Sequence, residues 1–137
     1  AAMGAYVIHV REALTRLRDT LRRQARGERV SIRTPHNAGR AANPEAVERA
    51  PIPVERIAAP VYLLGGMSDQ TWASGDMALN IADAREAAGL PTTALVFGEA
   101  GHGLGGPPTR PSDPGTAAAN AEAFPALLDF LDAALRR

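Results

Sequence analysis

The sequence contains no cysteine and no lysine, and only 4% of its residues are aromatic. The absence of cysteine excludes a disulfide framework. Its 15 basic residues, all arginine, are balanced by 15 acidic residues, so net charge gives no signal for binding a nucleic acid. The chain has no apolar run long enough to cross a bilayer and no secretory signal at its start. We therefore expect a cytoplasmic protein that binds neither membrane nor nucleic acid.

With 137 residues and 45% hydrophobic side chains, the chain has the size of one soluble domain or part of one. Apolar residues recur every three or four positions between Tyr6 and Arg26, which predicts a helix ended by Gly27. The alternative is a short strand over residues 6–10, followed by a helix from Arg11. The segment from Gly27 to Pro53 is rich in glycine, proline and asparagine, which predicts irregular chain. Within it, Arg29–Arg33 is the one further strand candidate.

A strand–helix–strand unit is predicted after Pro60. The apolar run Val61–Leu64 predicts a buried strand. Ser74 can cap a helix that Gly89 and Pro91 end, and residues 92–97 predict a second strand. Such a crossover makes the two strands parallel. A final helix is expected from about Thr116 to Leu135, with Pro125 as a kink or a late start, and with Ala123, Leu127, Leu128, Leu131 and Leu135 on one side.

Two parallel strands with one crossover helix cannot cover both faces of a sheet or protect both edges. We therefore expect an α/β fold that is incomplete in this chain and forms the carboxy-terminal part of something larger. Residues 1–50 would form an amino-terminal helix and an irregular linker, and residues 51–137 the α/β segment. A first residue that is Ala rather than Met agrees with truncation, although removal of an initiator Met would leave the same residue.

Two titratable residues follow the predicted strands, where ligands and catalytic groups gather in open parallel sheets. Asp69 comes after the first strand and His102 after the second. An acid followed by a histidine on successive loops matches the last two members of a hydrolase triad. The ordinary alternatives are a turn or capping aspartate and an exposed loop histidine. The order of the pair favours the catalytic interpretation.

Several motifs resemble the carboxy-terminal domain of the bile-acid-CoA:amino-acid N-acyltransferase and acyl-CoA thioesterase family, a branch of the α/β hydrolases. The resemblance covers about residues 50–135 and is most specific around Asp69. The motifs are Ile52-Pro53-Val54-Glu55-Arg56-Ile57, Pro60, Gly65-Gly66-Met67-Ser68-Asp69-Gln70-Thr71-Trp72-Ala73-Ser74, Ala100-Gly101-His102 and Asn120-Ala121-Glu122-Ala123. The resemblance implies that Asp69 and His102 are the acid and the general base of acyl transfer to water or to an amine.

The sequence departs from the family pattern at two places. Ala73 stands where the family usually has proline. The larger departure is the nucleophile, because the G-x-S-x-G elbow or its cysteine form is absent. None of the serines, Ser31, Ser68, Ser74 and Ser112, has a glycine two residues away on both sides. The oxyanion-hole donors associated with such an elbow are missing too, so we expect this chain alone to be inactive.

The predicted ligand is an acyl thioester or ester, with Trp72 and Leu104 lining the acyl pocket. We expect no metal, because His9 and His36 lack partners at ligand spacing. We also expect no dinucleotide cofactor. Residues 101–106 match G-x-G-x-x-G, but Pro107, Pro108 and Pro111 forbid the helix that would hold a pyrophosphate.

The predicted macromolecular partner is the missing amino-terminal half of the hydrolase or a second copy of the chain. Two alternatives stay open. One is a non-catalytic binding or dimerisation domain with the hydrolase carboxy-terminal fold. The other is a fragment of a dienelactone-hydrolase-like or peptidase-like enzyme, which shares the acid and histidine layout but not the run Ile52–Ile57.

Overall fold

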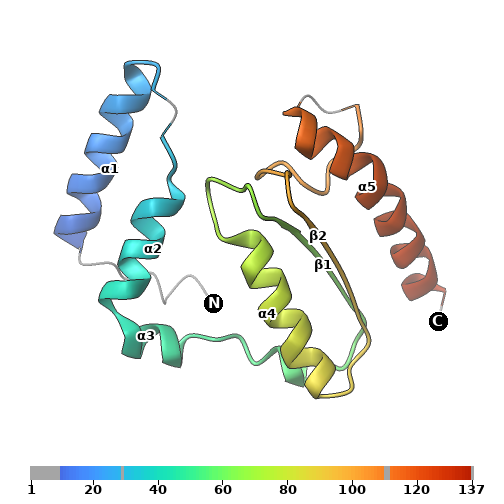
Figure 1. Ribbon diagram of the computed structural model, residues 1–137. Helices are drawn as coiled ribbons and strands as arrows, with labels where there is room; N and C mark the ends of the chain where they lie inside the picture. The colour runs from blue at the N-terminus through green and yellow to red at the C-terminus, as the bar shows by residue number, and fades with distance from the viewer. Residues whose placement is uncertain (1–9, 29, 110–111, 137) are drawn as a thin grey trace. The chain divides into compact units, whose positions relative to one another are not determined.

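A computed structural model describes residues 10–28, 30–109 and 112–136 (Figure 1). The chain divides into two compact units. Unit 1 holds Ala1–Ile52 and Gln70–Trp72, and unit 2 holds Pro53–Asp69 and Ala73–Arg137. No helix within the described residues is both long enough and apolar enough to span a membrane.

Unit 1 is helical. Helix α1 (Val10–Ala25) confirms the predicted helix over those residues, whereas the alternative strand over residues 6–9 lies outside the described residues. The chain turns after α1 at Gly27, whose φ of 80° favours glycine. Helix α2 (Arg33–Ala42) packs against α1 and leads into α3 (Pro44–Arg49).

Helices α2 and α3 show that the prediction of irregular chain between Gly27 and Pro53 was wrong. Pro35 and Pro44 lie in the first turns of these helices, where a backbone N–H has no intrahelical acceptor, so the missing proline N–H costs little. Asn43 separates the two helices, and its side-chain amide donates to Gly39 O at 2.9 Å. The candidate strand Arg29–Arg33 was also wrong for its described residues, because Arg33 begins α2.

Unit 2 contains the predicted strand–helix–strand unit. Strand β1 (Val61–Gly66) pairs in parallel with β2 (Thr92–Phe97), with Val61 opposite Thr92 and Gly66 opposite Phe97. The crossover helix α4 (Ser74–Ala87) packs on both strands. A short 3₁₀ helix, η2 (Val54–Arg56), precedes β1. Within the described part of the chain the sheet has these two strands only. The structure therefore has mixed helices and strands and is compatible with an α/β fold.

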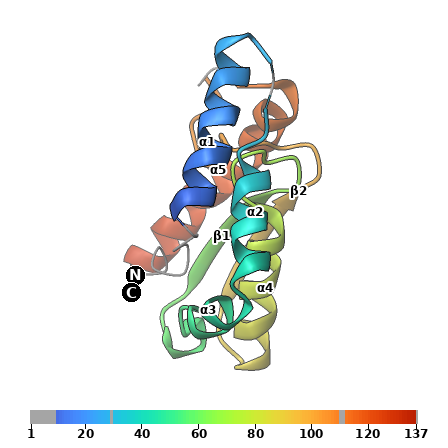
Figure 2. The ribbon, with the colours of Figure 1, turned by 90° about the vertical axis from the view of Figure 1, so that its left-hand side faces the viewer.

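Helix α5 (Pro114–Leu135) covers the face of the sheet opposite to α4, as Figures 1 and 2 show. Asp113 caps α5 by accepting a hydrogen bond from Thr116 N at 2.9 Å. Pro125 lies inside the helix, so the predicted late start there was wrong. Helix α5 thus supplies the second layer that the crossover unit alone could not provide.

The core of unit 2 is built from small side chains. Ala119 and Ala123 of α5 are 4% and 0% exposed, and Ala78 of α4 is 4% exposed. In contrast, Leu128, Leu131 and Leu135 are exposed, although the sequence placed them on the same apolar side as Ala123. The small alanine side chains let α5 approach the sheet closely. The exposed leucines lie further along the same helix.

Candidate active site

Asp69 and His102 meet at the carboxyl ends of the two strands, as their positions in the sequence predicted. Asp69 follows β1 and His102 follows β2. The distance from His102 Nδ1 to Asp69 Oδ2 is 3.1 Å. The Asp69 side chain is 1% exposed, whereas that of His102 is 57% exposed. The pair thus joins a buried carboxylate to an imidazole that is open to solvent.

Hydrogen bonds between the two loops hold this pair together. Met67 N donates to Phe97 O at 2.9 Å, and Ser68 N donates to Ala100 O at 3.1 Å. The Ser68 hydroxyl donates to Gly98 O at 2.9 Å. These bonds extend the parallel pairing beyond β1 and β2 and fix the spacing of the loops just before Asp69 and His102.

Gly66 allows the loops to approach each other. A Cβ atom at Gly66 would collide with the carbonyl oxygen of Ala100. Ala100 itself is fully buried. Glycine at this position therefore lets the backbones of the two loops come close together.

Ser74 is a site residue that the sequence analysis did not identify. Its hydroxyl donates to Asp69 Oδ2 at 2.7 Å and accepts from Gly66 N at 3.2 Å. The predicted capping role for Ser74 was wrong, because the N-cap of α4 is Ala73 and has no side-chain cap. The only available signal was a serine five residues after the acid, at the start of a helix, and that position more commonly indicates a cap.

The hydrogen bonds define the proton arrangement of the pair. An ionised carboxylate only accepts hydrogen bonds, so the proton of the neutral imidazole lies on Nδ1 when Nδ1 bonds to Asp69. Nε2 of His102 then carries the free lone pair on an exposed side chain. This arrangement can act as a general base.

Comparison with known families adds an independent observation. The family described as BAAT / Acyl-CoA thioester hydrolase C terminal matches residues 12–128. The chain belongs to this family. Searches among curated proteins and among solved structures gave no match. Membership indicates the carboxy-terminal part of a thioester hydrolase or acyltransferase.

The family match confirms the resemblance seen in the sequence and widens it. The motifs suggested a resemblance over about residues 50–135, whereas the BAAT / acyl-CoA thioester hydrolase match begins at residue 12. It therefore includes most of α1 and all of α2 and α3. The amino-terminal helices are part of the family domain, not an unrelated addition to it.

The two residues predicted to line an acyl pocket lie in different units. Trp72 belongs to unit 1, where its ring lies 4.2 Å from the ring of His36 at an interplanar angle of 31°. Burial lowers the pKa of His36, which favours the neutral ring in this stack. Leu104 is half-buried in the loop of unit 2 that carries His102. Contact of either residue with an acyl chain stays a prediction.

The glycine-rich match over residues 101–106 does not lead into a helix. Residues 102–106 form a turn and a bend, residues 108–109 form a turn, and α5 begins only at Pro114. The dinucleotide fingerprint requires a helix whose amino terminus follows the glycines. The glycines here instead shape the loop around His102.

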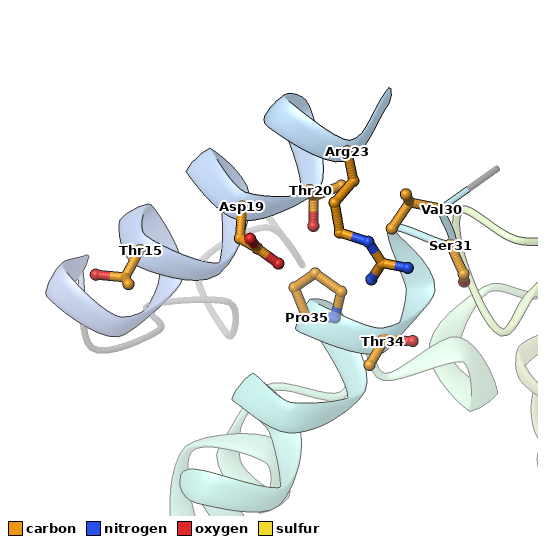
Figure 3. A pocket seen from close by; sticks show the side chains of 8 residues that line it. All are labelled: Thr15, Asp19, Thr20, Arg23, Val30, Ser31, Thr34 and Pro35. Carbon is orange, nitrogen blue, oxygen red and sulfur yellow. The ribbon is translucent and has the colours of Figure 1, made fainter. Parts of the chain in front are cut away.

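Unit 1 contains a cavity of about 350 Å³ (Figure 3). The residues that line it are Thr15, Asp19, Thr20, Arg23, Val30, Ser31, Thr34 and Pro35. Arg23 donates to Glu28 at 2.7 Å, and the Ser31 hydroxyl donates to Gln70 O at 3.1 Å. The guanidinium is thus already paired, and the serine is bonded to a carbonyl and not to a base. The Asp69–His102 pair is therefore the stronger candidate site.

Proposed function

We propose that this chain supplies the acid and the histidine of a nucleophile–His–Asp triad in an acyl-thioester or ester hydrolase or acyltransferase of the α/β-hydrolase class. The observation that carries the proposal is the 3.1 Å contact between His102 Nδ1 and the buried Asp69 carboxylate. It has the geometry that a general base needs. Membership in a thioester hydrolase family supports the substrate class.

In the proposed mechanism His102 moves the proton. Its Nε2 takes the proton from a Ser or Cys nucleophile as that nucleophile attacks the acyl carbonyl carbon. The proton then passes to the departing thiolate or alkoxide when the bond from the acyl carbon breaks. In the second half, Nε2 takes a proton from water or an amine as that acceptor attacks the acyl carbon. The bond from this carbon to the Ser or Cys then breaks, and His102 returns the proton to the nucleophile. Asp69 holds the ring and stabilises the imidazolium formed in each half.

The proposal places the nucleophile outside this chain. The Ser74 hydroxyl donates to Asp69 at 2.7 Å. A nucleophilic serine must instead donate to the histidine. Ser31 and Ser68 donate to the backbone carbonyls of Gln70 and Gly98. No G-x-S-x-G elbow surrounds any of the serines.

The partner we propose is the remainder of the hydrolase. Each strand of the two-stranded sheet has one neighbour within the described residues, and an open sheet edge is a template for further strands. Leu128, Leu131 and Leu135 of α5 are 50%, 41% and 81% exposed. Additional strands and helices would cover both features and would bring the nucleophile to the same end of the sheet.

A second candidate function is a non-catalytic binding or dimerisation domain. Leu17 and Leu21, one turn apart on α1, are 43% and 53% exposed, which is the arrangement of a helix seam. Sedimentation of the chain distinguishes the two hypotheses. A well-folded, discrete dimer favours the second candidate, whereas a monomer or an aggregating chain favours the fragment of a hydrolase.

The proposal is tested by the complete open reading frame that contains this sequence. We expect it, or an adjacent reading frame, to encode preceding strands and a G-x-S-x-G or G-x-C-x-G elbow. Rapid mixing of the complete protein with acyl-CoA should then release free thiol and leave an acyl group on that Ser or Cys, detected by mass spectrometry. Absence of an elbow from both reading frames would contradict the proposal.

A further inference from the structure

The loop that carries His102 is fastened to helix α5 by two buried polar side chains. Thr116 is 0% exposed and Asn120 is 1% exposed. They lie four residues apart and therefore on the same side of the helix. The sequence predicted only a helix start for Thr116, and Asn120 was only the first residue of a family motif.

The two side chains bond the loop backbone on both sides of His102. Thr116 Oγ1 accepts from Gly101 N at 2.8 Å. The Asn120 amide bridges two groups beyond His102: its Nδ2 donates to Gly103 O and its Oδ1 accepts from Gly105 N, each at 3.0 Å. The backbone at alternate positions of the loop is thus tied to one helix.

Two glycines allow the loop that carries His102 to lie close to α5. A Cβ atom at Gly103 would lie 3.2 Å from Thr116 Cγ2, and Gly105 has a φ of 83°. A side chain at the first position would push the loop away from α5, and a residue other than glycine is strained at the second. The glycine pattern around His102 thus fits the requirements of this attachment.

The His102 side chain itself has little to hold it. It is 57% exposed, and among the described residues its hydrogen bond is the one to Asp69. The position of the imidazole therefore depends on the backbone to which it is attached. Precise placement of a functional group requires such supporting contacts.

We propose that Asn120 and Thr116 are positioning residues that keep His102 on Asp69. Both act through the loop backbone and not on a substrate. The inference rests on the proposed function of His102 as the general base. It adds that helix α5, which supplies no member of the triad, sets the geometry of the histidine.

The test is the protonation site of neutral His102, measured by long-range ¹H–¹⁵N NMR on this chain, with the His102 signals assigned by their loss in His102→Gln. In the unchanged chain the Nδ1–H form should predominate, because Asp69 accepts from Nδ1. In Asn120→Ala and in Thr116→Val the ratio of the Nδ1–H form to the Nε2–H form should fall about fivefold. The loss of one typical hydrogen bond changes an equilibrium constant by about this factor. Thr116→Ser keeps the hydroxyl and should keep the ratio.

Tyr62→Phe provides the control for a merely structural effect. The Tyr62 hydroxyl donates to Ala123 O of α5 at 2.9 Å, so this variant weakens the attachment of the same helix without touching the loop. It should lower the melting temperature and leave the His102 ratio unchanged. If Asn120→Ala fails to fold, the comparison of Thr116→Val with Thr116→Ser decides.

Two results would overturn the inference, and they have different consequences. An unchanged ratio in Asn120→Ala and Thr116→Val would remove the positioning role and leave the proposed function standing. A ratio in the unchanged chain that shows no preference for Nδ1–H would remove the Asp69–His102 pair itself, and the proposed function would fall with it.

Discussion

Arg85 of α4 bonds five acceptors from a fully buried position, and its replacement should destabilise the protein strongly. The residue is 0% exposed. Each of its five guanidinium hydrogens has an acceptor at 2.7–3.1 Å, namely Thr92 Oγ1, Val54 O, Ile57 O, Ala59 O and Pro91 O. Arg85 thus joins the segment before β1 to the start of β2.

The magnitude follows from counting donors in Arg85→Lys. A lysine ammonium keeps the charge but has three hydrogens, so at least two of the five acceptors lose their bond. A hydrogen bond from a charged donor contributes about 1.5–3 kcal/mol. We therefore expect Arg85→Lys to lower the free energy of unfolding by about 3 kcal/mol or more. Arg85→Ala, which removes all five bonds, should cost more.

Urea denaturation followed by circular dichroism measures this loss. With a slope of about 1–3 kcal/mol/M, the midpoint should move down by about 1 M or more. Arg136→Ala is the matched control, because the Arg136 side chain is 77% exposed and donates to its helical neighbour Asp132. That variant should change stability by less than about 1 kcal/mol. A midpoint for Arg85→Lys equal to that of the control would show that the five hydrogen bonds of Arg85 do not stabilise the fold.

Three further perturbations have defined outcomes. Tyr62→Phe removes the bond from β1 to α5 and should lower the free energy of unfolding by about 1 kcal/mol in urea denaturation. Gly66→Ala forces a methyl group onto the carbonyl of Ala100 and should cost about 1–3 kcal/mol, seen as a lower melting temperature. Hydrogen bonds from the backbone N–H and the hydroxyl of Thr116 lower the pKa of Asp113. The stability that the ionised Asp113 cap contributes should therefore be present above about pH 3.9, the ordinary aspartate value, and be lost as pH falls through the lowered pKa. In melting curves recorded against pH, Asp113→Asn should lack this step.

For each of these three perturbations, one result would contradict the prediction. Equal stability of Tyr62→Phe and the unchanged chain would mean that the bond to α5 contributes nothing. Full stability of Gly66→Ala would show that the loops are not in close contact. An acid transition that persists unchanged in Asp113→Asn would assign it to another carboxylate.

The central unit of the fold could be predicted because its signals are local. An apolar run between Pro60 and the glycine pair at residues 65–66 predicted β1, and Gly89 with Pro91 marked the end of α4. The site pair followed from the same elements, since the carboxyl ends of parallel strands meet at one edge. Asp69 and His102 were predicted in this way, and the structure brings them into contact.

The features that were missed depend on long-range contacts or on ambiguous residues. The prolines after Gly27 predicted irregular chain, but Pro35 and Pro44 lie in the first turns of helices. Arg85 has the spacing of an ordinary solvent-facing arginine in an alanine-rich helix, and its acceptors come from the segment before β1 and the start of β2. The same holds for Ser74 and Asn120, whose side chains bond groups in other loops. A helical period does not distinguish such buried polar residues from exposed ones.

In the proposed function, His102 is the general base of acyl transfer and Asp69 holds its ring. The most direct measurement is kcat/KM for acyl-CoA hydrolysis by the complete protein and by its His102→Ala and Asp69→Asn variants, with Asn80→Ala on the exposed surface of α4 as the control. We expect both site variants to fall by about 10³–10⁴-fold while the control keeps full activity. Turnover by the site variants within a few fold of the unchanged enzyme would contradict the proposed roles of His102 and Asp69.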